Sequence, residues 1–487
     1  MDHERNLTAC EAAAAIRRRE LMSETLVRAL FAAIEANRHL NAFTAVQPEI
    51  FLEAARSADR LAAEGRFTGP LHGVPLAVKD NIHVATFPNT AGTRAMQGFR
   101  PRAHAPIVQR LMNAGALVLG KTNLHELGLG VTSNNPVFGP VRNPYDPSRI
   151  AGGSSGGTAS AVAAGLSPAG LGTDTGRSLR IPAALCGIAA LRPTVGRYSQ
   201  AGITPISRTR DTAGPMARTV RDLVLLDSAI TGTPHQSSAA CLRGLRLGFD
   251  RQFFANVDEQ TAARAGIALG VLRHAGVQIV PVVIPEVFEL TARAALGITL
   301  YEAARDLSTY LRQFAIACDV KELAFRVASP DVRRALAMVA EHRDFAARAY
   351  GPARDARRRL QLAYRNEFAR NGLAALAFPT TPLPAPLVGH DDFIELNGER
   401  VPTALILARN TEPGSIAGIP GISVPIGLTP SGLPVGLALD ASPGNDRQVM
   451  SIGVALEELL APSAAASLSN RRDRNPRMQS RPKSSRA

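Results

Sequence analysis

Lys79 is a residue that could act as a base, because it follows a short apolar run, Val74-Pro75-Leu76-Ala77-Val78. Only four of the 55 basic residues in this chain are lysines. Burial at the end of a strand lowers the pKa of a lysine and favours its neutral amine. A neutral amine can accept a proton, which arginine cannot do. The residues also allow a second interpretation, a strand-end lysine whose ammonium reaches solvent.

Ser154 and Ser155 are candidate nucleophiles, since they lie among four glycines in the segment GGSSGGT, residues 152–158. The segment fits the pattern GxSxG twice, once around each serine, and this is the nucleophile elbow of α/β-hydrolases. His390, beside Asp391, would then be the partner base. The segment is neither a phosphate-binding loop nor a GxGxxG turn. The alternative to a nucleophile elbow is a flexible glycine-serine turn without a catalytic role.

Ser178 lies in a second glycine-flanked turn, GTDTGRSLR, residues 172–180, which follows a predicted strand. The turn could expose the Ser178 hydroxyl. The backbone N–H groups of Thr175, Gly176 and Arg177 could converge on one point, as an oxyanion hole requires. A structural network of Asp, Thr and Ser caps is the alternative interpretation.

Together these segments resemble the signature block of the amidase signature family. The intervals from Lys79, within AVKDNI, to Ser154 and from Ser154 to Ser178 match those between the family's lysine, cis-serine and nucleophilic serine. The segments HELGLGVTSNN (125–135), RNTEPGSIAGIPGISVPIGL (409–428) and SGLPVG (431–436) extend the resemblance over most of residues 70–460. Within the family, the TSNN, RNP, SPDV and GIPG elements are similar to those of indoleacetamide and mandelamide hydrolases.

The resemblance implies a Ser–Ser–Lys mechanism with no cofactor and no metal. Ser178 would be the nucleophile that forms an acyl-enzyme. Ser154, on a cis peptide bond, would pass the proton, and Lys79, neutral at rest, would be the final base. Ser155 and Asp174 would brace the two loops. The expected reaction converts a small primary carboxamide, of the aryl-acetamide type, to carboxylate and ammonia.

Arg177 departs from the family pattern, which commonly has glycine or a small residue before the nucleophile. Arginine keeps its N–H, so the expected oxyanion donors Thr175, Gly176 and Arg177 are all present. Arginine nevertheless disfavours a positive φ and adds a long cation.

Three alternatives to this amidase function stay open: an A-type subunit of an aminoacyl-tRNA amidotransferase, a family member that binds without turnover, and the α/β-hydrolase described above.

The elements that must position these residues alternate between strands and helices, which predicts an α/β fold. The resemblance implies an α/β/α layered fold around a mostly buried mixed sheet. The expected strands are residues 74–78, 116–119, 169–173, 373–378, 422–427 and 433–439. The expected helices are residues 8–65, 104–114, 158–166, 255–275, 300–372 and 448–460. We expect one domain over residues 1–470, with the signature region at about 70–220, and a disordered basic tail over residues 471–487.

The composition narrows the class of partner. The formal charge is +14, but a large share of it lies in the basic tail, and the chain has no Trp with which to stack bases. We therefore expect no nucleic-acid partner. No apolar run long enough to span a membrane and no secretory leader are recognisable, so no membrane partner is expected. The four cysteines form no CxxC pair, which suits a cytoplasmic enzyme. The expected partner is a small-molecule amide, and a homodimer stays open.

Overall fold

A central β-sheet forms the core of the protein. The computed structural model describes residues 3–234 and 238–472 of the chain. Eleven strands of these described ranges form that sheet, in the order β1-β3-β2-β6-β8-β7-β14-β15-β11-β9-β10. The strands are β1 (Phe43–Val46), β2 (Pro75–Lys79), β3 (Leu117–Thr122), β4 (Asn134–Asn135), β5 (Gly139–Pro140), β6 (Ala169–Asp174), β7 (Ala189–Arg192), β8 (Thr212–Ala217), β9 (Arg246–Phe249), β10 (Gln278–Pro281), β11 (Ala375–Pro379), β12 (Phe393–Leu396), β13 (Glu399–Pro402), β14 (Gly421–Leu428) and β15 (Pro434–Asp440).

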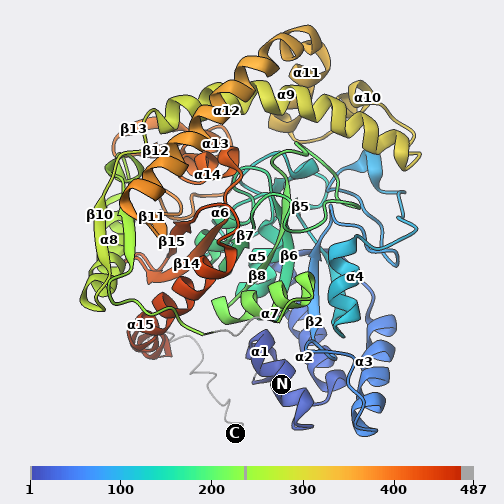
Figure 1. The fold of residues 1–487 in the computed structure, drawn as a ribbon. Helices are drawn as coiled ribbons and strands as arrows, with labels where there is room; N and C mark the ends of the chain where they lie inside the picture. Colours follow the sequence, from blue (N-terminus) through green and yellow to red (C-terminus); the bar gives the residue numbers. More distant parts are fainter. Residues whose placement is uncertain (1–2, 235–237, 473–487) are drawn as a thin grey trace, which may run out of the picture.

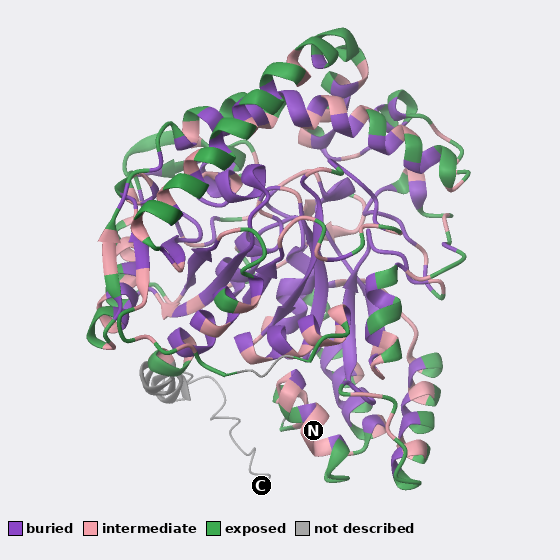
Figure 2. Cartoon of the chain, in the orientation of Figure 1, coloured by how far each residue is buried: buried purple, intermediate pink, exposed green. Residues whose placement is uncertain are grey.

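The sheet is mixed. Strand β2 runs parallel to both β3 and β6, whereas β6, β8, β7, β14 and β15 follow one another in antiparallel pairs. Strands β2, β6, β7, β8, β11 and β15 are buried along their whole length. Figure 2 shows this buried sheet inside a shell of helices whose outer faces are exposed. The predicted α/β fold with a central mixed sheet is confirmed.

Helices pack around the central sheet (Figure 1). The α-helices are α1 (Ala9–Arg17), α2 (Ser23–Ala36), α3 (Pro48–Ala63), α4 (Pro106–Asn113), α5 (Gly156–Ala163), α6 (Arg180–Cys186), α7 (Val220–Thr231), α8 (Glu259–His274), α9 (Val287–Gln313), α10 (Val320–Arg326), α11 (Pro330–Glu341), α12 (Arg343–Asn371), α13 (Thr403–Ala408), α14 (Glu412–Ala417) and α15 (Asp446–Arg472). The 3₁₀ turns are η1 (Glu4–Asn6), η2 (Arg38–Leu40), η3 (Arg94–Met96), η4 (Glu126–Gly128) and η5 (Arg251–Phe254).

Three groups of helices matter for the site. Helices α5 and α6 follow the two glycine-rich segments and pack against each other and against central strands. Helices α7, α8 and α15 pack on the same sheet, and α15 also contacts α7 and α8. The long helices α9 and α12 lie side by side at the top of the molecule in Figure 1, and α14 packs between them and the sheet.

The N-terminal prediction of one helical stretch over residues 8–65 is wrong, because the stretch contains three separate helices, α1, α2 and α3. A strand, β1, interrupts it and pairs antiparallel with β3, Phe43 opposite Thr122. Two local signals mark the interruption. Asn41 adopts the left-handed conformation with φ 53°, and Pro48 begins α3. Asparagine tolerates that conformation better than most residues, and proline is favoured in the first turn of a helix.

The other expected elements are found, with corrections to their limits. The predicted strands correspond to β2, β3, β6, β11, β14 and β15, and the predicted helix at 300–372 is a series from the second half of α9 to α12. Helix α15 begins at Asp446 and reaches Arg472, and residues 473–487 of the predicted tail lie outside the described residues. No helix within the described ranges is long and apolar enough to cross a membrane.

Candidate active site

Lys79 ends β2 and is fully buried. Its Nζ donates to three hydroxyl groups: Ser154 Oγ at 2.7 Å, Thr173 Oγ1 at 2.8 Å and Ser155 Oγ at 2.9 Å. No carboxylate is paired with Lys79 among the ion pairs of the described residues. The interpretation of Lys79 as a strand-end lysine that reaches solvent is therefore wrong. The arrangement is instead an amine surrounded by hydroxyls, through which a proton can move.

Burial lowers the pKa of Lys79 to about 7, because the charged ammonium loses its hydration. The nearby carboxylates Asp174 and Asp211 act in the opposite direction and limit the shift. An amine with this pKa is partly neutral at neutral pH. Lys79 can therefore accept a proton without a prior change in its surroundings.

The segment between Ala151 and α5 presents Ser154 to Lys79. The peptide bond between Gly153 and Ser154 is cis, as the family resemblance implies. The carbonyl of Ser154 accepts the N–H of His125 at 3.1 Å, which fixes the backbone at this point. Gly157 allows the start of α5 to lie close to the backbone at Ala42. A Cβ on Gly157 would lie only 2.5 Å from the carbonyl oxygen of Ala42.

Asp174 holds the turn that carries Ser178 through its hydrogen bonds and ion pairs. The two carboxylate oxygens of Asp174 accept from Arg192 Nη1 at 2.9 Å and from Arg180 Nε at 3.3 Å. The backbone N–H of Leu179 also donates to Asp174, at 3.2 Å. Burial acts to raise the pKa of Asp174, but the charges of Arg180 and Arg192 outweigh it and lower that pKa to about 2. Asp174 is thus a permanent buried anion that ties the turn to α6 and β7.

Ser178 lies directly after this turn and is 6% exposed. Its carbonyl oxygen accepts the N–H of Ser155 at 3.2 Å, so the two glycine-rich segments are joined at their serines. Within the described residues its hydroxyl has no hydrogen-bond partner. The structure therefore brings Ser178 beside the Lys79 cluster and leaves its hydroxyl free to contact another molecule.

Thr175, Gly176 and Arg177 form the rest of the turn. Thr175 donates its hydroxyl to Asp211 at 2.6 Å, and Asp211 also accepts the N–H groups of Ile206 and Ser207, each at 2.9 Å. Burial raises the pKa of Asp211 to about 6. This contact fixes one end of the turn whose N–H groups are the expected oxyanion donors.

The concern that Arg177 needs a positive φ is not borne out. Nine residues other than glycine have a positive φ in the described ranges, and Arg177 is not among them. Its φ therefore lies outside the left-handed region that arginine disfavours. Its side chain pairs with Glu412 at 3.3 Å.

His390 does not contact either serine of the elbow pattern. It is exposed, and its backbone carbonyl accepts the Thr403 hydroxyl at 2.8 Å. Its neighbour Asp391 bonds Thr132 and Asn134. The hydroxyl of Ser154 is instead paired with a lysine, which disfavours the α/β-hydrolase alternative.

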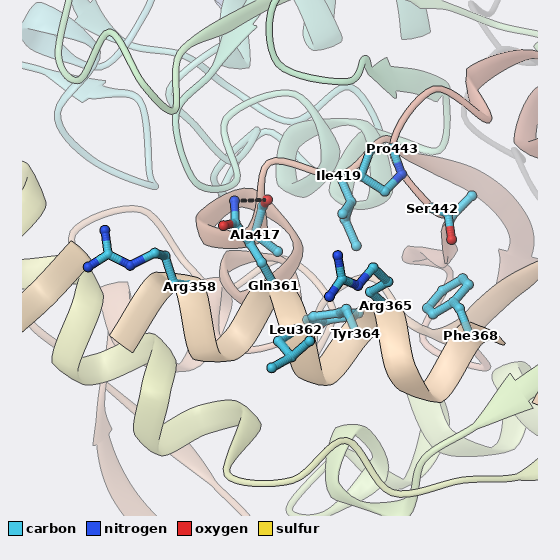
Figure 3. A pocket seen from close by; sticks show the side chains of 11 residues that line it. Arg358, Gln361, Leu362, Tyr364, Arg365, Phe368, Ala417, Ile419, Ser442 and Pro443 are labelled. Atoms are coloured by element: carbon cyan, nitrogen blue, oxygen red, sulfur yellow. Dashed lines mark hydrogen bonds between the residues drawn. The ribbon is translucent and has the colours of Figure 1, made fainter. Parts of the chain in front are cut away.

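A separate cavity lies along α12, away from this cluster. It has a volume of about 460 Å³ and is lined by apolar and basic side chains such as Leu362, Arg365 and Phe368 (Figure 3). None of Lys79, Ser154 and Ser178 lines it. Gln361 in this cavity donates to the carbonyl of Ala417 at 3.0 Å, which joins α12 to the end of α14.

Three residues of the site are not among those that the sequence indicates. Thr173 is the third hydroxyl on Lys79, Asp211 holds the oxyanion turn, and Glu412 pairs with Arg177. Thr173 had a usable signal, because it ends a predicted strand one position before the Asp of the turn. Asp211 and Glu412 are distant in sequence and had none.

The comparisons with known proteins show the family of the chain. The family model described as Amidase matches residues 25–450. An indoleacetamide hydrolase of Agrobacterium vitis is 42% identical over 447 residues, which cover 91% of this chain and 95% of that protein. A mandelamide hydrolase of Pseudomonas putida is 41% identical over 479 residues, covering 94% of this chain and 92% of that protein. The native peptide amidase of Stenotrophomonas maltophilia superposes with a TM-score of 0.82 at 32% identity, covering 94% of this chain and 97% of that one.

Proposed function

This chain belongs to the amidase family, and from that membership we propose that it hydrolyses a small aryl-acetamide-type primary amide to carboxylate and ammonia. The observation that carries the proposal is the contact of 2.7 Å between Lys79 Nζ and Ser154 Oγ inside the protein. Relatives named as hydrolases of indoleacetamide and mandelamide support the substrate class. The proposed enzyme is cytoplasmic and acts on a free small-molecule amide, with no nucleic-acid partner. A homodimer is compatible with this proposal.

The proposed mechanism begins with attack of Ser178 Oγ on the amide carbon. The Ser178 proton passes to the Ser154 hydroxyl, whose own proton passes to Lys79 Nζ. The tetrahedral intermediate then breaks its C–N bond, and the same proton returns through Ser154 to the leaving nitrogen, which departs as ammonia. Water attacks the acyl ester by the same relay and releases the acid.

The electrostatics of the site support this sequence of steps. A base with a pKa of about 7 can take a proton during attack and return it to the leaving group at the same pH. The N–H groups of Thr175, Gly176 and Arg177 are the proposed donors to the oxyanion. The bond from Thr175 to Asp211 and the ion pairs of Asp174 support a preorganised turn.

Apolar residues near Ser154 support an aromatic acyl group. A Cβ placed on Gly128 would lie 3.4 Å from Ile206 Cδ1 and 3.6 Å from Ser154 Oγ. Leu127, the preceding residue, is buried. Apolar surface beside the relay serine Ser154 favours an aryl group over the charged amino-acid end of glutamine.

Ammonia release from a panel of amides tests this proposal. The panel contains indole-3-acetamide, mandelamide, phenylacetamide, benzamide, malonamide and glutamine, with Ser178→Ala as the inactive control. We expect the arylacetamides to have the highest kcat/KM. A preference for glutamine, or activity only with partner subunits and charged tRNA, would replace this proposal with the amidotransferase alternative.

A further inference from the structure

Arg177 places a cation next to the proposed nucleophile, and the structure gives that cation a partner. Arg177 Nη1 lies 3.3 Å from Glu412 Oε2, and the arginine side chain is 25% exposed. Glu412 is the first residue of α14, from a segment far away in the sequence. The departure from the family pattern at position 177 is therefore accommodated by a specific ion pair.

The same carboxylate is shared with a second arginine. Arg210 Nη2 lies 3.1 Å from Glu412 Oε1, and the Arg210 side chain is only 3% exposed. Its other terminal nitrogen donates to Thr299 Oγ1 at 2.8 Å, while its Nε is buried without a hydrogen-bond partner in the described structure. Arg177, Glu412 and Arg210 thus form a charge cluster of two guanidiniums and one carboxylate.

The charge cluster lies against the oxyanion turn. A Cβ placed on Gly176 would lie 3.2 Å from Arg210 Nη2 and 3.4 Å from Glu412 Oε1. Gly176 is two residues before Ser178. Each guanidinium donates one N–H to a different oxygen of the Glu412 carboxylate, and two cations that converge on one carboxylate form an anion-binding site.

We propose that Arg177 and Arg210 form a carboxylate subsite beside Ser178, which Glu412 occupies, and that Glu412 thereby prevents retention of the acid product. This inference rests on the proposed function, since that reaction turns a neutral amide into a carboxylate at Ser178. Two uncompensated guanidiniums would attract the product more strongly than the substrate. With Glu412 in place, that attraction is reduced and the neutral amide can compete.

The test compares binding of acid and amide to inactive protein. Phenylacetate and phenylacetamide are titrated calorimetrically into Ser178→Ala, Ser178→Ala/Glu412→Gln and Ser178→Ala/Glu412→Gln/Arg177→Gln. Glutamine keeps the shape of Glu412 and removes its charge. We expect Glu412→Gln to strengthen phenylacetate binding about tenfold relative to phenylacetamide, as the loss of one charge at short range implies. Added Arg177→Gln should reverse most of that gain.

Two further variants and one structure complete the test. Glu289→Gln removes an exposed carboxylate of α9 that pairs with Arg293, and it should leave the acid-to-amide ratio unchanged. Crystals of the Glu412→Gln protein in inorganic sulfate should hold an ion between Arg177 and Arg210 that the Glu412 protein lacks. An unchanged ratio in Glu412→Gln, or no ion between the two arginines, would overturn the subsite. If neither phenyl compound binds Ser178→Ala, the proposed substrate class fails, and the sulfate structures alone decide on the subsite.

Discussion

Lys79 is the residue whose chemistry can be tested most sharply by substitution. Arginine preserves the charge but not the ability to lose a proton, so Lys79→Arg should be as inactive as Lys79→Ala. Loss of a general base commonly lowers kcat by about 10²–10⁴-fold. Steady-state kinetics of both variants measure this effect. Lys321→Arg, which changes a lysine on the exposed side of α10, is the matched control and should keep full activity.

The pH dependence of the wild type follows from the same residue. Burial lowers the pKa of Lys79 to about 7, and only the neutral amine accepts a proton. The value of kcat/KM should therefore rise with pH and level off above a midpoint near 7. His390→Ala should retain this profile. If Lys79→Arg stays active while His390→Ala is inactive, the base has been assigned wrongly.

Asp174 allows a prediction about stability. Asp174→Asn would leave Arg192 buried without its anion and Arg180 paired with Asp440 alone, and such a loss typically costs about 3–5 kcal/mol of the free energy of unfolding. Urea unfolding measures the cost. The control, Asp146→Asn, weakens a half-exposed pair with Arg149 and should cost less than about 1 kcal/mol.

The stabilising effect of Asp174 should also depend on pH in one direction. Its pKa is lowered from 3.8 to about 2 in the folded protein. The contribution is therefore complete above pH 4 and is lost as the pH falls from about 4 to 2. A difference between wild type and Asp174→Asn that persists unchanged at pH 2 would contradict this assignment.

At the scale of residues, the sequence was informative where chemistry and spacing coincide. Lys79 was recognisable because a lone lysine follows an apolar strand in an arginine-rich chain, and the structure buries it among hydroxyls. Glu412 was not recognisable. A single carboxylate in a polar segment looks like any surface acid until the fold brings it to Arg177.

At the scale of elements, the glycines of the 152–158 segment serve close packing. A Cβ on Gly157 would collide with the backbone carbonyls of Asn123 and Ala42, which cannot move aside. Gly157→Ala should therefore shift α5 and lower the free energy of unfolding by about 1–3 kcal/mol. Thermal unfolding measures this loss.

Gly266 provides the matched control for that substitution. It lies inside α8, and apart from its chain neighbours and the backbone of its own helix no atom comes within 4 Å of the added Cβ. Alanine is a better helix former than glycine, so Gly266→Ala should raise the free energy of unfolding by about 0.5–1 kcal/mol. Equal effects of the two substitutions would mean that close packing is not the reason for Gly157.

Strands with a continuous apolar run were predictable, and strands that depend on their neighbours were not. Strand β2 is an apolar pentapeptide buried at every position. Strand β1 is a tetrapeptide between two helices and is only half-buried along its length. Its pairing with β3 decides its conformation, and no local pattern specifies that pairing.

For the molecule as a whole, local sequence patterns do not predict the order of strands in the sheet. Strand β7 pairs with β14, which lies in the last part of the chain, and this pairing brings α14 to the turn of Ser178. Only the family resemblance indicated such a layered sheet. The contact between Arg180 and the carbonyl of Thr411, at 2.9 Å, is one result of that long-range pairing.

The basic C-terminal end should be dispensable for catalysis. The described core contacts of α15 come from residues such as Val449, Ile452 and Leu456, well before the basic residues begin. Removal of residues 469–487 should therefore leave kcat/KM unchanged and lower the pI. A large loss of activity would mean that this end contributes to the site or to an interface between subunits.

The identity of the serine that a sulfonyl fluoride modifies tests the Ser–Ser–Lys relay most directly. The protein is treated with an arylmethanesulfonyl fluoride, digested with trypsin and analysed by mass spectrometry. Cleavage after Arg149, Arg177 and Arg180 separates Ser154 and Ser155 from Ser178. We expect the added mass on Ser178, with labelling strongly slowed in Lys79→Arg. Labelling of Ser154 or Ser155 instead would contradict the relay.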